Sequence, residues 1–153
     1  MRRFTMTWLA TALALTCISC SGTTGQSEYD IVRQMTHDVS AYTQGLVYAD
    51  GKIYESTGRL GYSQVRILNA TNGALESHVS LPDDRFGEGL ALLNGKLYQL
   101  TWKSGVGYVY DAATLALQDS FNYAGEGWGL TTDGTSLIMS DGTSSLRVLD
   151  PAT

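Results

Sequence analysis

One glutamate in this chain has neighbours that suit proton-transfer chemistry. Glu88 lies between Gly87 and Gly89, directly after Phe86 and directly before the apolar run 90–93. Glycines on both sides let a ligand or another backbone approach closely, and they leave the carboxylate uncrowded. Among aromatic neighbours, desolvation would raise the pKa of Glu88 towards working pH, as a general acid or base requires. The equally weighted alternative is a structural carboxylate that only hydrogen-bonds a neighbouring element.

The tripeptide that begins with Glu88 recurs in register along the chain. Gln44-Gly45-Leu46, Glu88-Gly89-Leu90 and Trp128-Gly129-Leu130 each open a strand-like run, and the glycines are 44 and 40 residues apart (45 to 89, then 89 to 129). Four short strands in each repeat of about 40–45 residues are typical of a β-propeller blade. A β-sandwich, the alternative, also has short strands but requires no such repeat. We therefore predict an all-β chain, a β-propeller with about three blades of four strands.

The repeat also predicts which side chains meet. Because the innermost strands of a propeller line a central channel, residues at equivalent repeat positions form rings. The channel mouth is therefore expected to combine an amide, carboxylates and several aromatic rings, the usual form of a small-ligand site. The three equivalent sets are Gln44, Glu88 and Trp128; Tyr42, Phe86 and Glu126; and Gly58, Trp102 and Gly142.

Two features of the register predict an incomplete ring. Residues 28–38 stand where an outer strand belongs, yet no first three strands precede them. In closed propellers such an outer strand completes the last blade. Only three blades follow, whereas a propeller has typically 4–8, and the third stops before its own outer strand. We expect a fragment or a C-terminally truncated product with unpaired sheet edges.

Composition and charge narrow the functional classes. Charged residues make up 16% of the chain and the net charge is −5, with no basic patch, which argues against nucleic acid as a partner. The sequence contains no Gly-x-Ser-x-Gly, no His-Glu-x-x-His and no glycine-rich phosphate loop, and we expect no metal and no cofactor. His37 and His78 fall in or beside outer strands, away from the channel, and are expected to be solvated.

The first twenty residues predict export. Arg2 and Arg3 precede a mostly apolar run, residues 8–18, which is shorter than the about 20 residues that span a bilayer and fits a signal peptide. The residues before Cys20 resemble a bacterial lipoprotein signal in which Cys20 becomes lipidated, although Cys17 stands where an aliphatic residue is usual. An ordinary cleaved signal is the alternative, and neither leaves a cysteine pair for a disulfide.

We therefore predict a signal peptide in residues 1–20, a polar tether in 21–27 and a partial propeller domain in 28–153. The expected location is the periplasm or cell envelope. Contact with a membrane is expected only through the lipid anchor.

Six short strings follow one another along the chain. They are Tyr42-Thr43-Gln44-Gly45-Leu46, Tyr54-Glu55-Ser56-Thr57-Gly58, Phe86-Gly87-Glu88-Gly89, Leu100-Thr101-Trp102-Lys103, Glu126-Gly127-Trp128-Gly129-Leu130 and Ser140-Asp141-Gly142. In order and spacing they resemble the plant and bacterial glutaminyl-peptide cyclotransferases. These are five-bladed β-propellers, unrelated to the zinc-dependent animal enzymes. The resemblance covers roughly residues 29–153.

The resemblance implies cyclisation of N-terminal glutamine to pyroglutamate with release of ammonia, in peptides or proteins that begin with glutamine. It implies that Glu88 is the catalytic carboxylate and shuttles the proton. Gln44 would hold the substrate amide, and Trp128 would offer an indole N–H. The aromatic wall would consist of Phe86 and Trp102, with Tyr42 where phenylalanine is usual.

The family's later asparagine, a further tryptophan and a lysine have no counterpart in this sequence. We therefore expect the 153-residue form to be inactive alone. Ammonia release by this form that disappears in Glu88→Gln would refute that expectation and support the assignment of Glu88. The alternative function is a non-catalytic envelope lipoprotein that binds peptides or protein partners and is indifferent to Glu88→Gln. A metal-dependent sugar or lactone enzyme would need more carboxylates and asparagines around the channel.

Overall fold

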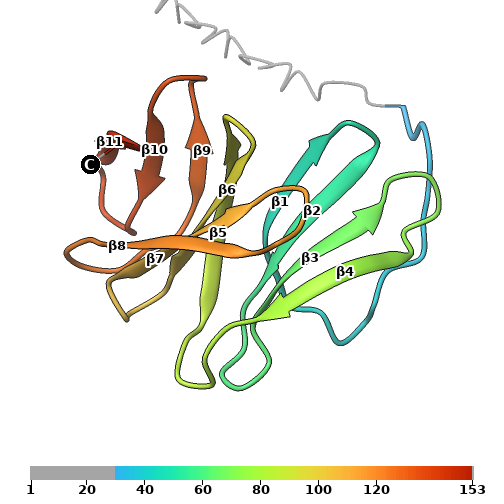
Figure 1. Ribbon diagram of the computed structural model, residues 1–153, viewed down its shortest axis with the longest axis horizontal. Helices are drawn as coiled ribbons and strands as arrows, with labels where there is room; N and C mark the ends of the chain where they lie inside the picture. Colours follow the sequence, from blue (N-terminus) through green and yellow to red (C-terminus); the bar gives the residue numbers. More distant parts are fainter. Residues whose placement is uncertain (1–29, 153) are drawn as a thin grey trace, which may run out of the picture. The chain divides into compact units, whose positions relative to one another are not determined.

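The computed structural model describes residues 30–152, which contain strands and turns and no helix (Figure 1). Arg33–Thr153 forms one compact unit. Its strands make three antiparallel sheets, each with neighbours in chain order. The first sheet contains β1 (Thr43–Ala49), β2 (Lys52–Thr57), β3 (Gln64–Asn69) and β4 (Leu75–Ser80); the second β5 (Gly87–Leu93), β6 (Lys96–Thr101), β7 (Val106–Asp111) and β8 (Leu117–Asn122); the third β9 (Leu130–Thr132), β10 (Leu137–Ser140) and β11 (Leu146–Leu149). The predicted blades are confirmed.

Tight hairpins connect the first two strands of the first two blades. Asp50 and Gly51 both have positive φ (50° and 76°), as do Asn94 and Gly95 (52° and 74°). Two consecutive residues in the left-handed region define the type I′ turn, whose twist matches that of the paired strands. The Asp-Gly and Asn-Gly pairs therefore set the register of each blade.

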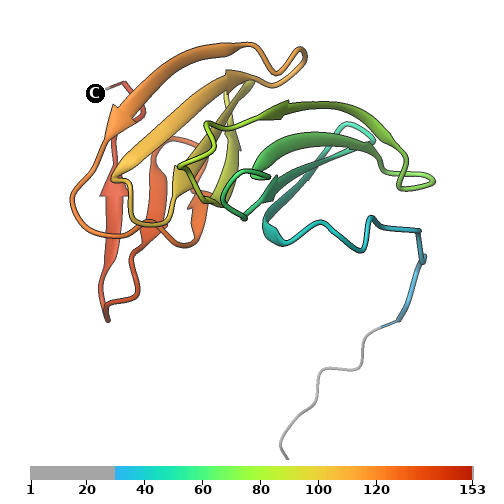
Figure 2. The same cartoon turned by 90° about the horizontal axis from the view of Figure 1, so that it is seen from below.

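The core lies between the blades. The innermost strands are neighbours, because β1 packs against β5 and β5 against β9, and Figure 2 shows the sheets side by side. Between the first two blades, Val65 and Ile67 meet Leu97 and Tyr110. Val65 and Leu97 are completely buried, and each contributes about 1.5–3 kcal/mol relative to an exposed side chain.

The recurring glycine of the first two blades has a steric role. A β-carbon on Gly45 would lie 2.6 Å from the backbone nitrogen of Leu90, and one on Gly89 would overlap backbone atoms of Trp128 and Leu130. The backbone amide of Gly89 also donates a 2.7 Å hydrogen bond to the carbonyl of Trp128. Glycine recurs because neighbouring inner strands touch backbone to backbone at this level.

Gly89→Ala is expected to lower the free energy of unfolding by about 1–3 kcal/mol, since the added methyl group forces two backbones apart. Gly129→Ala is the matched control, because its β-carbon would meet only the Ser140 hydroxyl, at 3.0 Å. Urea unfolding of both variants measures the difference. Equal losses would contradict the backbone-contact explanation.

The expected outer strand in residues 28–38 is not observed: residues 30–38 contain no strand. A strand requires a ladder of backbone hydrogen bonds to a neighbour, and this segment has none in the described part of the chain. Side chains hold it instead. His37 Nε2 lies 2.8 Å from Glu55 Oε1, and Arg66 Nη1 lies 3.1 Å from Asp38 Oδ2.

Candidate functional site

Gln44 and Glu88, at equivalent repeat positions, occupy β-bulges at one end of the inner strands. The pairing of β1 with β2 skips Gln44, and the pairing of β5 with β6 skips Glu88 together with Gly89. A bulge places two residues opposite one and redirects the side chain. In the third blade, Trp128 lies just before β9, and backbone hydrogen bonds join both Trp128 and Gly129 to Ser140.

All six predicted site residues line one pocket, of about 590 Å³. In residues 30–152, neither the Gln44 amide nor the Glu88 carboxylate has a hydrogen-bond or ion-pair partner, so both are free to meet a ligand. The assignment of these residues to catalysis and binding remains a prediction. The pocket contains Tyr42, Gln44, Phe86, Glu88, Trp102 and Trp128, together with Gly129.

Aromatic rings form a continuous wall. The Phe86 ring packs edge-on against Tyr42 and Trp102, with centroid distances of 6.2 and 5.7 Å. The glycines of the third equivalent set make room for these rings: a β-carbon on Gly58 would overlap the Phe86 ring, and one on Gly142 would lie 2.8 Å from the Trp128 ring.

Glu126 links the two tryptophans. Its Oε2 accepts hydrogen bonds from the indole N–H of Trp102 (2.7 Å) and of Trp128 (3.0 Å). Lys103 Nζ lies 4.0 Å from the Trp102 ring centroid and 3.7 Å from Glu126 Oε1. These hydrogen bonds hold the pKa of Glu126 below its usual value. The repeat placed Glu126 in the second equivalent set but predicted no role for it. The indole N–H of Trp128, which was expected to face the substrate, donates to Glu126 instead.

Glu88 has the electrostatics of a proton shuttle. Burial, and secondarily the negative charge of Glu126, raises the pKa of Glu88 from 4.5 to about 7. A group with a pKa near the working pH is present in both forms and transfers protons efficiently. This elevation matches the expectation from its aromatic surroundings.

Comparison with known proteins connects this geometry to a family. The family model for glutamine cyclotransferase matches residues 5–153. The chain belongs to this family. It is 41% identical, over 129 residues, to a glutaminyl-peptide cyclotransferase of Arabidopsis thaliana, a match that covers 83% of this chain and 40% of that protein.

Solved structures agree with the family and the fold. The chain superposes on the Myxococcus xanthus glutaminyl cyclase with a TM-score of 0.73 and 34% identity, covering 80% of this chain and 52% of that one. The WD40 repeats of RRP9 match in fold alone, with a TM-score of 0.60 and 13% identity over 74% of this chain and 36% of theirs. The propeller prediction is confirmed. The chain spans about half the length of these relatives or less.

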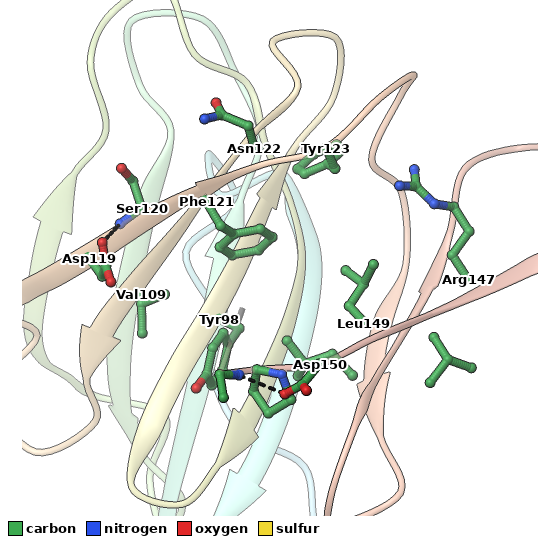
Figure 3. A pocket seen from close by; sticks show the side chains of 14 residues that line it. Tyr98, Val109, Asp119, Ser120, Phe121, Asn122, Tyr123, Arg147, Leu149 and Asp150 are labelled. Atoms are coloured by element: carbon green, nitrogen blue, oxygen red, sulfur yellow. Dashed lines mark hydrogen bonds between the residues drawn. The ribbon is translucent and has the colours of Figure 1, made fainter.

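A second hollow, of about 570 Å³, lies between β8 and β11 and contains none of the predicted site residues (Figure 3). Tyr98 belongs to the core between the second and third blades, against which Phe121 and Leu149 pack, and all three side chains border the hollow.

Residues 30–152 contain neither a metal-ligand cluster nor a membrane-spanning helix. No group of three or more His, Cys, Asp or Glu side chains in these residues could hold a metal ion. No helix among them is long and apolar enough to cross a membrane. The predicted signal peptide, with Cys20, lies outside the described residues.

Glu126→Gln is expected to lower the pKa of Glu88 below about 7, because it removes a negative charge that disfavours the ionised carboxylate. Carboxyl NMR titration of the 153-residue chain measures this without any need for turnover. Asp119→Asn, on the outer strand β8, should leave the pKa of Glu88 unchanged. An unchanged pKa in Glu126→Gln would refute the coupling.

Proposed function

We propose that this chain carries the glutamine pocket and the proton-transferring carboxylate of a glutaminyl-peptide cyclotransferase. The observation that carries the proposal is the convergence of Glu88 and Gln44 in one aromatic pocket, in a chain of the glutamine cyclotransferase family. The elevated pKa of Glu88 supports it. The substrate class is peptides or proteins that begin with glutamine.

In this proposal Glu88 carries two protons away from the α-nitrogen, one after the other. The α-ammonium of the glutamine gives the first proton to the ionised Glu88, and the resulting amine attacks its own γ-carboxamide carbon. A C–N bond forms to close the five-membered ring. Glu88 gives this proton to the amide nitrogen, whose C–N bond to the carboxamide carbon breaks. The ionised Glu88 then takes the second proton from the ring nitrogen and passes it to the departing ammonia, which leaves the lactam N–H, an ammonium ion and the original carboxylate.

The amide of Gln44 is a free hydrogen-bond donor in the pocket. Because the indole N–H groups of Trp102 and Trp128 donate to Glu126, we assign to the amide of Gln44 the contact with the substrate carboxamide oxygen, where negative charge develops during attack. The rings of Phe86 and Trp102 would flank the glutamine side chain and exclude water.

The test separates binding from turnover, because the chain spans only part of its relatives. Binding of a short Gln-first peptide is measured in the 153-residue chain by tryptophan fluorescence, with an Ala-first peptide as control. Turnover is measured in a fusion in which residues 30–153 replace the matching segment of the Myxococcus cyclase. We expect Gln-selective binding and ammonia release. A folded fusion that binds the Gln-first peptide, releases no ammonia and returns the peptide unchanged would refute the proposal.

We also propose that the protein is exported and attached to the cell envelope through a lipid on Cys20. The apolar run 8–18 after Arg2 and Arg3, ending before Cys20, supports this. Expressed in a bacterium with labelled palmitate, the protein should carry the label, and Cys20→Ser should not. Label retained in that variant, or absent from both, would contradict lipidation at Cys20.

A further inference from the structure

The glutamine pocket continues past Tyr42 into two further hollows. The first, of about 400 Å³, shares Tyr42 and Phe86 with the pocket and extends to Arg59. The second, of about 320 Å³, shares Tyr42 and Arg59 with the first and extends to Tyr62. Together they form a path along one side of the site, from the carboxylate of Glu88 to the guanidinium of Arg59.

Arg59 is held at a fixed place relative to Glu88. The Ser63 hydroxyl, 2% exposed, accepts a hydrogen bond from the backbone amide of Arg59 and donates one to its carbonyl, both at 2.9 Å. The same hydroxyl accepts from the backbone amide of Gly87, at 3.1 Å. Since Gly87 immediately precedes Glu88, one buried hydroxyl ties the Arg59 loop to the catalytic bulge.

Arg59 is the cation beside this path that has no acidic partner. Its guanidinium carbon lies 5.4 Å from the Tyr62 ring centroid, which orients the guanidinium without using its N–H donors. Arg66 pairs with Asp38, and Lys103 faces Glu126. Among residues 30–152, no carboxylate forms an ion pair with Arg59. A guanidinium presents a planar fork of donors that matches a carboxylate.

We propose that the path from Glu88 to Arg59 binds the peptide residues that follow the N-terminal glutamine, and that Arg59 recognises a carboxylate there. The proposal rests on the proposed function, and it adds a preference among substrates. The charges along the path agree with the direction of such a peptide. The ionised Glu126 lies at the end that receives the α-ammonium, and the unpaired guanidinium lies at the other end.

The recognised carboxylate has two possible sources, an Asp or Glu side chain or the C-terminus of a very short peptide. C-terminally amidated Gln-Glu-Ala, Gln-Gln-Ala and Gln-Lys-Ala separate them from free-acid Gln-Gln-Ala. Because an exposed ion pair contributes about 0.2–1 kcal/mol, the preferred acidic peptide should bind the 153-residue chain about 1.4–5-fold more tightly than its neutral counterpart at low salt.

Calorimetric titration of the 153-residue chain tests the proposal. The preference should vanish in Arg59→Gln and persist in Arg147→Gln, which changes the net charge equally on β11. A preference that persists in Arg59→Gln, no preference, or no peptide binding would each overturn it. Failure of the proposed function looks different: acidic peptides would bind through Arg59 while the fusion releases no ammonia. Turnover in the fusion without any acidic preference would leave the function standing and remove this subsite.

Discussion

Glu88→Gln in the fusion should lower kcat for ammonia release by about 10²–10⁴-fold, the range expected when a positioned acid–base group is removed. Glutamine preserves the size of the side chain and its place in the bulge, but it can neither accept the proton from the α-ammonium nor deliver it to the leaving nitrogen. KM should change little, because Gln44 and the aromatic wall remain. A loss in kcat with unchanged KM marks an interaction made only in the transition state.

The pH dependence gives an independent check on Glu88. The ascending limb of kcat/KM should lie near the pKa of Glu88, about 7, because the reaction starts from the ionised carboxylate, and Glu88→Gln should remove this limb. Glu76→Gln, on the outer strand β4, is the matched control and should retain both rate and profile. Residual activity in Glu88→Gln within tenfold of the unmodified fusion would exclude Glu88 as the shuttle.

The sequence predicted the residues that line the pocket because equivalent positions of a repeat occupy equivalent places in each blade. Once Gln44, Glu88 and Trp128 are equivalent, the closed geometry of neighbouring blades brings them to one level. In the first two blades, the glycine that follows allows a close backbone contact with the next blade. A structural requirement that recurs in successive blades therefore appears in the sequence as a periodic residue.

The role of Glu126 is different, because it depends on the direction of side chains from separate blades. Two indole N–H groups meet one carboxylate oxygen only after Trp102 and Trp128 have turned towards each other across blades, and no spacing in the sequence encodes this. The available signal was the position of Glu126 two residues before Trp128, in a set of repeat positions next to the set that contains Trp102.

The same limit applies to the segment before β1. His37 was predicted to be solvated and is exposed, but the sequence did not predict that its ring also bonds the carboxylate of Glu55. Alternation along β2 places Glu55 on one face of the first blade, but it does not reveal that residues 37–43 fold over that face. The segment has no periodicity of its own, so its contacts follow from tertiary packing alone.

Arg66→Met should lower the free energy of unfolding by about 3–5 kcal/mol, the cost of leaving a buried charge without its partner. Glu55 is completely buried. Its Oε1 accepts hydrogen bonds from His37 and Thr43, whereas its Oε2 has no hydrogen bond and faces only the Arg66 guanidinium, at 3.7 Å. Methionine keeps the apolar volume of the side chain and removes that cation.

Urea unfolding followed by circular dichroism measures the loss. Arg147→Met is the matched control, since Arg147 stands at the same repeat position on β11 but bonds only the carbonyl of Ala124; it should cost less than about 1 kcal/mol. The double variant Arg66→Met with Glu55→Leu should recover most of the loss, because an apolar replacement of a whole buried pair is often neutral. A double variant no more stable than Arg66→Met would show that packing, not charge, explains the effect.

The contacts of Glu55 with His37, Thr43 and Arg66 also connect the stability of the first blade to the pocket that contains Gln44. Glu55 accepts from Thr43, which directly precedes the bulged Gln44, so a carboxylate that rehydrates would release the start of β1. Gln-first peptides should therefore lose affinity for Arg66→Met at urea concentrations where the chain is still folded, while the double variant keeps its affinity. If affinity falls only together with global unfolding, the network stabilises the blade without positioning Gln44.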